Sequence, residues 1–412
     1  GSMENARLEL VRRCDMPPGA NLMNSHFVFD VKPRPDNSIE KFKARLVCDG
    51  QTQLKGCDYD QIFATVVKLV SIRVVLAIAA AQDWGLWQLD IKQAFLQADV
   101  TEKLYMRMPP HLPNMDAAGN TLVCRLRKSL YGLKQAAKCW SEKLASTLER
   151  FGCRRSIIDT CVYRYDGDHQ REPGRVLLIL IYVDDIVIAY SHEDIRLRFL
   201  EYICAELPVD DRGELSWILR MEVSRDRTNR SITLSQQHYA DTLVEKCMPP
   251  ACVLRQYDSP LDEETHPLSY DQCPDVGSDL HAAMTEKRAT YMSAVGGLLW
   301  LAAGTRPDLT YAVSLLARFC SNPGPPHYAA LMRVLGYLTR TRHYVLRIAP
   351  DRASEVEVYS DASWLTRSSV SGGLILFWHV LVAWWSRLQK SVSASTAEAE
   401  TYAAALASRE GV

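Results

Sequence analysis

The sequence predicts an α+β fold, and the order of its hydrophobic segments supports this in three ways. The longest apolar run, Val176 to Val183, is followed at once by Ile186 to Ala189, so a buried β-hairpin is expected. An alanine-rich interior predicts a helix over 71–82, and apolar residues at three-to-four spacing predict one over 134–150. Strands and helices alternate irregularly, which favours α+β over a doubly wound fold.

The remaining elements are predicted in chain order. His26 to Lys32 and Phe42 to Val47 read as strands of a hairpin that turns at Asp36-Asn37. Ser71 is a candidate N-cap for the helix over 71–82, and the short strand over 86–89 ends just before Asp90. Helices are expected over 289–303, 312–319 and 329–338, strands from Val356, and an alanine-rich helix from Ala397.

Composition excludes several classes of protein. With 47% hydrophobic and 24% charged residues in 412, the chain is not disordered, collagenous or built on disulfides. No apolar run approaches the roughly 18 residues needed to span a bilayer. Twelve cysteines without a Cys-x-x-Cys pair indicate an intracellular protein with reduced thiols. Gly1-Ser2-Met3 looks like an expression scar and is left out of the fold reasoning.

Charge is segregated along the chain although the net charge is only −1. Residues 125–155 carry nine basic side chains against two acidic ones, whereas residues 257–280 carry seven acidic side chains and no Lys or Arg. The basic stretch is typical of a phosphate-binding face and the acidic stretch of a solvated linker. A merely solvated helix face is the alternative for the basic stretch.

Two adjacent carboxylates, Asp184 and Asp185, lie at the turn of the apolar hairpin. Aspartate is an ordinary turn residue, so a solvated hairpin tip is one interpretation. Asp210-Asp211 is an equally adjacent pair in what reads as a polar loop, and no role is assigned to it. Strands as apolar as these are buried on both faces and end inside the domain, where bare charge is costly. Asp184 and Asp185 are therefore expected to attract a cation.

Asp90 also follows a short apolar strand. Alone it would be a turn or cap acid, but on a strand next to the hairpin it would join Asp184 and Asp185 in binding a pair of Mg²⁺ ions. Two such ions stabilise the attacking and leaving oxygens of an in-line phosphoryl transfer.

Together these segments resemble the motifs of reverse transcriptases, most closely those of copia-type LTR retrotransposons. The resemblance covers nearly the whole chain after about residue 25, in order. The matching segments are Lys43–Val47, Asp58–Phe63, Asp90–Phe95, Ser129–Trp140, Tyr182–Asp185, Leu234–Gln236, Thr305–Asp308, Tyr337–Leu338, Tyr359–Ala362 and Ser395–Glu400.

The resemblance implies a right-hand polymerase fold of fingers, palm and thumb, followed by a helical connection region and a partial RNase H-like domain. The implied divisions are an N-terminal extension (1–25), fingers and palm (26–207), primer grip and thumb (208–257), acidic linker and helical thumb/connection region (258–350) and a truncated RNase H-like domain (351–412).

The resemblance also implies an activity, RNA- and DNA-templated DNA synthesis. Asp90, Asp184 and Asp185 match the catalytic, metal-binding aspartates, which use two Mg²⁺ ions or Mn²⁺ as a substitute. The implied partners are an RNA template, a DNA primer or RNA–DNA hybrid, and dNTPs. A homodimer is a further option, a membrane is not expected, and the location is a cytoplasmic virus-like particle or the nucleus.

Further residues match substrate-binding positions of the family. Phe95 matches the aromatic residue that blocks a 2′-hydroxyl, although core packing is the commoner fate of a Phe. Gly132 and Gln135 match residues that support the templating base pair and the incoming nucleotide, and Tyr182 precedes the paired aspartates. The hairpin cations that would grip a triphosphate, or be plain surface charges, are Lys32, Lys43 and Arg45.

Some positions depart from the family pattern. Asp49 stands where a Lys is usual, and Arg220 replaces a glycine of the primer grip. Asp361 and Glu398 match the first two metal-binding carboxylates of RNase H, and the later ones would lie beyond Val412. Two residues on, Glu400 is expected on another face of the helix, so RNase H activity is not expected. The alternative to a polymerase is a catalytically reduced nucleic-acid-binding or structural subunit.

Overall fold

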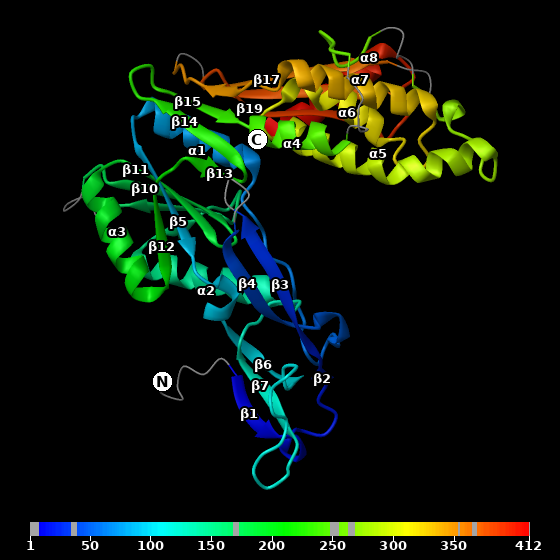
Figure 1. Cartoon of the computed structure of the whole chain (residues 1–412). Coiled ribbons are helices and arrows are strands. Elements are labelled where there is room, and N and C mark those ends of the chain that lie inside the picture. Colours follow the sequence, from blue (N-terminus) through cyan, green and yellow to red (C-terminus); the bar gives the residue numbers. More distant parts are fainter. Residues whose placement is uncertain are drawn as a thin grey trace. The chain divides into compact units, whose positions relative to one another are not determined.

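The computed structural model describes residues 8–33, 39–167, 173–247, 255–262, 268–352, 355–364 and 369–411. It divides into two compact units, each considered by itself (Figure 1). The first unit contains residues 1–67 and 85–214, and the second contains residues 68–84 and 215–412. The segment 68–84 therefore interrupts the first unit in sequence but belongs to the second. The domain boundaries implied by the resemblance are finer than this division and stay predictions.

A six-stranded sheet forms the centre of the first unit, in the order β12-β5-β11-β10-β9-β8. Its strands are β5 (Gly85–Ile91), β8 (Arg154–Arg155), β9 (Val162–Asp166), β10 (Val176–Tyr182), β11 (Asp185–Tyr190) and β12 (Val209–Glu214). The predicted apolar hairpin is confirmed as β10 and β11, whose inner residues are almost all buried because β9 and β5 flank them.

Helices α2 (Ala136–Phe151) and α3 (Glu193–Glu206) share one hydrophobic core with this sheet. The predicted face of α2 is confirmed, since Trp140, Leu144 and Leu148 are all at most 2% exposed. Helix α3 was not predicted, although Ile195, Phe199 and Ile203 repeat every four residues and are fully buried.

Two smaller sheets complete the first unit. One has the order β1-β7-β6-β2, from strands β1 (Leu8–Arg12), β2 (Leu22–Met23), β6 (Asp99–Arg107) and β7 (Leu122–Lys128). The other is the predicted hairpin of β3 (Ser25–Pro33) and β4 (Ile39–Cys48), and its predicted turn at Asp36-Asn37 lies outside the described residues. Because side chains alternate along a strand, Lys41, Lys43 and Arg45 share one face of β4.

The second unit combines α-helices with two sheets. Its helices α4 (Gln237–Cys247), α5 (Asp279–Gly304), α6 (Thr310–Ala317) and α7 (Pro325–Thr341) pack around one core. Strands β13 (Trp217–Ile218), β14 (Met221–Asp226), β15 (Ser231–Ser235) and β16 (Leu346–Ile348) form one sheet, and β17 (Val356–Ser363), β18 (Val370–Phe377) and β19 (Val380–Leu388) form the other. Helix α8 (Thr396–Gly411) packs on β17 and β18.

Helix α1 (Leu69–Ala81) belongs to the second unit because buried arginine contacts hold it there. Arg73, 4% exposed, donates to the carbonyl oxygens of Gly304 at 2.7 Å and Val382 at 2.9 Å. Its guanidinium carbon lies 3.9 Å from the centre of the Trp384 ring. The helix begins before Ser71, so the prediction that Ser71 caps it was wrong, and Lys68 occupies the N-cap position.

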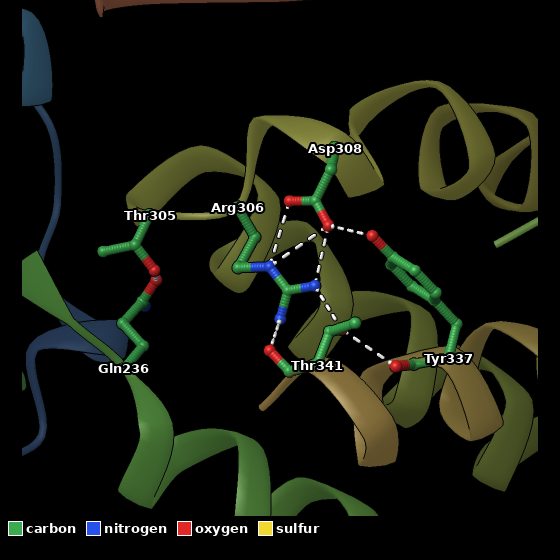
Figure 2. A network of polar contacts seen from close by, with 6 residues as sticks. All are labelled: Gln236, Thr305, Arg306, Asp308, Tyr337 and Thr341. Atoms are coloured by element: carbon green, nitrogen blue, oxygen red, sulfur yellow. Dashed lines mark hydrogen bonds and ion pairs between the residues drawn. The ribbon is translucent and has the colours of Figure 1, made fainter. Parts of the chain in front are cut away.

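A second buried arginine, in the segment between α5 and α6, connects this segment to the end of α7 (Figure 2). Arg306 is 2% exposed, pairs with Asp308 at 2.7 Å and donates to the Thr341 carbonyl at 3.0 Å. The Tyr337 hydroxyl donates to the same Asp308 carboxylate at 2.8 Å. The segments Thr305–Asp308 and Tyr337–Leu338, which matched the family in sequence, therefore meet in one polar network with a structural role.

The acidic stretch differs from the predicted solvated linker. Asp262 pairs with Arg333 of α7 at 2.5 Å, and Asp258 pairs with Arg340 at 2.9 Å. The guanidinium of Arg333 also stacks on Tyr257, 4.2 Å from the ring centre. The described part of the stretch before residue 263 thus packs on α7. Within the described ranges, no helix combines the length and apolarity that a membrane span requires.

Candidate active site

The turn between β10 and β11 contains only Val183 and Asp184, because Tyr182 and Asp185 are paired across the hairpin. Val183 has a φ of +58°, which is strained for a β-branched residue. Both turn carbonyls are held by neighbouring elements. The Trp140 Nε1 of α2 donates to the Val183 oxygen at 2.6 Å, and the Ile91 amide donates to the Asp184 oxygen at 2.9 Å. The turn is therefore fixed from two sides.

Strand register brings three aspartates to one end of the central sheet. β11 pairs with β5 so that Asp185 lies directly opposite Asp90, and Asp184 precedes Asp185 in the turn. Asp90 lies inside β5, one residue before its end, rather than after the strand. Antiparallel neighbours directly opposite have Cβ atoms about 4.5–5.5 Å apart, so the carboxylates of Asp90 and Asp185 share one small region.

The electrostatics of this region favour a bound cation. Burial raises the pKa of the Asp184 carboxyl, and the charge of Asp90 raises it further, while Lys43 acts in the opposite direction. Burial also raises the pKa of Asp185, followed by the charges of Asp184 and Asp90. Each carboxylate thus makes the ionisation of its neighbours less favourable, a repulsion that a divalent cation would relieve.

A cationic side chain that the sequence did not reveal already lies against this cluster. Arg212 Nη2 is 2.9 Å from Asp90 Oδ2 and 3.2 Å from Asp210 Oδ2. The prediction that Asp210-Asp211 forms a polar loop was wrong, because both residues belong to β12, and Asp210 is opposite Asp90. The only local sequence signal was Gly213, whose φ of +81° suits a β-bulge.

The donor chemistry at this end of the sheet fits Mg²⁺, which prefers carboxylate oxygens. The guanidinium of Arg212 occupies the position of a cation next to Asp90, at hydrogen-bond distance. As they stand, however, the described residues include no group of three or more Asp, Glu, His or Cys side chains arranged to hold a metal ion. The carboxylates whose donor chemistry fits Mg²⁺ are Asp90, Asp184 and Asp185, and Asp90 is engaged by Arg212.

Phe95 lies in a 3₁₀ turn (Ala94–Gln97) just past β5, after Gln93 at φ +55°. Its half-buried ring packs against both hydrophobic cores of the first unit. The ring of Tyr131 meets it edge-on, with centres 5.4 Å apart and planes inclined by 73°. Core packing and a sugar-facing role are both compatible with this partly exposed position.

Gly132 has a clear steric reason to be glycine. Its φ is +90°, and a Cβ at this position would lie 2.0 Å from the Cys48 carbonyl oxygen. The backbone of Tyr131 accepts a hydrogen bond from the Cys48 amide at 2.8 Å. The chain before α2 is thereby docked against the end of β4, and any larger residue would force the two apart.

Gln135 is 1% exposed, and its amide is used within the protein. Its Oε1 accepts from Gln53 Nε2 at 2.9 Å, and its Nε2 donates to the Asp58 carbonyl at 2.8 Å. The Lys134 amide also donates to Gln53, at 2.8 Å. Gln135 therefore positions the loop over residues 53–58.

The basic face of the β3–β4 hairpin lines a groove with residues from the adjoining loops. The groove is lined by Lys41–Leu46, Gln93, Leu96, Leu130 and Tyr131. Arg45 lies 3.7 Å from Asp30, and Lys43 lies close enough to influence Asp184. Tyr182, 37% exposed, stands at the end of β10. The side chain of Lys32 lies outside the described residues.

The RNase H-like carboxylates are arranged differently from the prediction. Glu398 accepts a hydrogen bond from the Ala394 amide at 2.6 Å, at the start of its own helix. Glu400, which was expected to point elsewhere, accepts from the Ala362 amide of β17 at 3.3 Å, next to Asp361. The packing of α8 on β17 overrides the simple helix-face argument. Glu400 is thus the carboxylate brought to the strand that carries Asp361.

Comparison with known proteins shows the family of this chain. The profile of the family described as "Reverse transcriptase (RNA-dependent DNA polymerase)" matches residues 9–252, which include all three aspartates. The chain is 34% identical over 403 residues to the retrovirus-related Pol polyprotein from transposon TNT 1-94 of Nicotiana tabacum, covering 96% of this chain and 29% of that protein.

Two further relatives extend the comparison. The Pol polyprotein from transposon RE2 of Arabidopsis thaliana is 33% identical over 96% of this chain and 26% of its own length. The Transposon Ty1-JR2 Gag-Pol polyprotein of Saccharomyces cerevisiae is 24% identical over 93% of this chain and 21% of its own length. The chain spans less than a third of the length of these curated relatives.

The match over residues 9–252 covers more than half of the chain and therefore shows its class. The chain belongs to the reverse transcriptase (RNA-dependent DNA polymerase) family. Within it, the predicted resemblance to the Pol polyproteins of copia-type retrotransposons is confirmed.

Proposed function

We propose that this chain is an RNA- and DNA-templated DNA polymerase whose active centre lies at the Asp90–Asp185 end of the central sheet. The observation that carries the proposal is the register of β5 and β11, which sets Asp185 opposite Asp90 next to a fixed turn holding Asp184. The six-stranded sheet then acts as the palm and the β3–β4 hairpin as part of the fingers. Of the predicted primer grip and thumb, 208–257, the residues from 215 onward lie outside this sheet and take that role.

Asp90, Asp184 and Asp185 would hold two Mg²⁺ ions, or Mn²⁺ in their place. Bound there, the ions would lower the charge repulsion between the primer 3′-hydroxyl and the α-phosphate of a dNTP. The chain's own contribution is positioning, because Trp140 and Ile91 fix the turn before any ligand arrives. The partners are an RNA or DNA template, a DNA primer and dNTPs.

The other candidate residues bind and select the incoming nucleotide. Lys43 and Arg45 face the groove beside the aspartates, where cations would contact a triphosphate. Phe95, supported edge-on by Tyr131, stands where its ring would exclude a 2′-hydroxyl. Gly132 docks the Leu130–Tyr131 side of this groove against β4, and Gln135 holds the separate loop over residues 53–58. Tyr182 is exposed at the hairpin end for contact with the primer terminus.

Primer extension on RNA and DNA templates tests the proposal. Asp184→Asn should reduce dNTP incorporation by about a thousandfold or more, while primer–template affinity changes little, because that affinity comes mainly from phosphate contacts. Asp194→Asn is the matched control, since Asp194 pairs with Arg175 on the surface and takes no part in the site. Near-normal extension by Asp184→Asn would refute the assignment. Absence of extension by the unaltered chain, with hybrid binding intact, would favour a catalytically reduced subunit.

A further inference from the structure

We propose that Arg212 is a built-in competitor of the metal ions, which holds Asp90 in the metal-free protein and must release it before the site can load. The proposal rests on the proposed function, since it assumes that Asp90 is a metal ligand. It goes further by assigning a residue that limits metal affinity. It also names Asp210 as the carboxylate that receives Arg212 afterwards.

The backbone places Arg212 at this position by a β-bulge. Asp211 is paired with Leu89 and Gly213 with Gln88, so Arg212 is the extra residue on β12. A bulge re-aims the side chain of its extra residue, and here that side chain reaches across to β5. The bulge is itself held, because Asp211 Oδ1 accepts from Trp87 Nε1 at 2.6 Å and from the Gly213 amide at 2.9 Å.

The contacts of Arg212 oppose metal binding by the three aspartates. Its Nη2 donates to Asp90 Oδ2 at 2.9 Å, which occupies an oxygen that a metal ion would need. Its charge also acts on Asp185, which lies directly opposite Asp90. In the described part of the chain, no cluster of three such side chains is arranged for a metal. Arg212 therefore stabilises the metal-free state at the expense of the loaded one.

Asp210 provides the alternative partner for the guanidinium. Its Oδ2 is 3.2 Å from the same Nη2, and it flanks Asp90 on the neighbouring strand. Arg212 is 49% exposed, so its side chain can move toward Asp210 without disturbing the core. An exposed ion pair is weak, which suits a contact that must be broken in each loading event.

Equilibrium Mn²⁺ binding, measured from the paramagnetic resonance of free Mn²⁺ without nucleic acid or dNTP, tests the competition directly. Arg212→Gln should bind Mn²⁺ about three- to tenfold more tightly than the unaltered protein, because an ion pair and a nearby positive charge are both removed. Arg175→Gln removes the same charge from a surface pair with Asp194 and should leave the affinity unchanged.

Asp210→Asn should change the Mn²⁺ affinity in the opposite direction. Without its second partner, Arg212 stays on Asp90, so Mn²⁺ binding should weaken about two- to fivefold. Loss of the Asp210 charge alone would also weaken binding, so the substitution is repeated in the Arg212→Gln background. There the effect of Asp210→Asn should be clearly smaller. Equal effects in both backgrounds would exclude Asp210 as the receiving carboxylate.

The outcomes separate this inference from the proposed function. If the unaltered protein binds Mn²⁺ and extends primers but Arg212→Gln, shown to be folded by its thermal unfolding, binds Mn²⁺ no more tightly, the competition is refuted. If the unaltered protein neither binds Mn²⁺ nor extends primers, the proposed function fails and this inference with it. Tighter binding by Arg212→Gln together with a larger metal-induced rise in unfolding temperature supports the competition.

Discussion

Trp140 shows how one side chain fixes the position of a catalytic turn. Its ring is 2% exposed in the core, and its Nε1 donates to the carbonyl of Val183, whose φ of +58° is otherwise unfavourable. A strained turn persists only where its surroundings hold it. The sequence predicted the burial of Trp140 from helical periodicity. It gave no sign of the hydrogen bond, because that contact joins residues 43 apart.

Trp140→Phe should therefore slow nucleotide addition strongly and reduce the stability of the fold only moderately. The Phe ring keeps most of the buried area, so we expect a loss of about 1–2 kcal/mol in the free energy of unfolding from the missing bond. The freed turn should lower kcat for single-nucleotide addition about tenfold or more. Trp384→Phe is the control, because it also loses one bond to a carbonyl, that of Ala302 at 2.8 Å, in the other unit. Equal effects of the two substitutions on kcat would contradict the role of the turn.

Asp185 offers a prediction about pH. Because burial and the charges of Asp184 and Asp90 raise its folded-state pKa, folding favours the protonated carboxyl. This contribution to stability is complete at pH values below the pKa that the Asp185 carboxyl has in the unfolded protein. It is lost as pH rises through the pKa of the same carboxyl in the folded protein. At neutral pH the ionised group therefore costs stability.

Asp185→Asn should consequently unfold at a higher temperature than the unaltered protein at pH 7.5, by roughly 1–4 °C, although it is inactive. The difference should shrink as pH falls toward 4, where both side chains are neutral. Thermal unfolding without divalent metal across this range is the measurement. Asp194→Asn, whose carboxyl has its pKa lowered by Arg175, should show the opposite sign. A lower unfolding temperature for Asp185→Asn at pH 7.5 would contradict the electrostatic account.

Sequence periodicity predicted the helices and strands that bury one regular face. The hairpin β10–β11 and helix α2 were predicted closely, because their apolar residues repeat with the period of a strand or helix. Strand β12 was mistaken for a loop, since its residues are mainly charged and its pairing with β5 lies about 120 residues away in sequence. Helix α5 begins at Asp279, ten residues before the prediction, because its first turns are polar.

The hairpin β13–β14 contains Arg220, which replaces a glycine of the family pattern, and its geometry leads to a prediction about this residue. Leu219 and Arg220 form its turn at φ values of +48° and +62°, a left-handed pair that strongly prefers glycine. Arg220→Gly should raise the free energy of unfolding by about 0.5–1 kcal/mol, since it removes backbone strain. Chemical denaturation measures this effect.

The same variant tests whether Arg220 contacts nucleic acid. If Arg220 reaches a phosphate, Arg220→Gly should weaken primer–template binding and reduce the salt dependence of binding by about one ion. Arg227→Gly is the comparison, because Arg227 is an exposed arginine paired with Asp83 outside this turn. A stabilised variant with unchanged affinity and salt slope would mean that Arg220 is only a strained substitute for glycine.

For the whole molecule, the sequence predicted the family, which the comparisons confirm, but not the division into units. Short ordered motifs revealed the family, since the same side chains are needed for the same chemistry. The transfer of residues 68–84 to the second unit depends on long-range contacts. Arg73 reaches carbonyls more than 200 residues away, and Arg225 binds the Trp84 carbonyl, 141 residues away. No local pattern carries such information.

Residues 351–412, which resemble part of an RNase H domain in sequence, lead to the last prediction, that this chain does not cut the RNA strand of an RNA–DNA hybrid. Asp361 is exposed on β17, Glu400 binds the neighbouring Ala362 amide, and Glu398 is engaged at the start of its own helix. A two-metal nuclease needs several converging oxygen ligands. Of these carboxylates, Glu400 is bonded to the strand of Asp361 and Glu398 is not, which leaves fewer oxygen ligands than two metal ions need.

A labelled hybrid incubated with Mg²⁺, and separately with Mn²⁺, should remain uncut above the level of Asp361→Asn. Weak cutting in Mn²⁺ alone would indicate an incomplete site. In that case Glu400→Gln should remove the cutting and Glu398→Gln should not, because only Glu400 is bonded to the strand of Asp361. Robust cutting in Mg²⁺ that depends on Asp361 would overturn the prediction and require a further carboxylate, from this chain or a second copy, to complete the site.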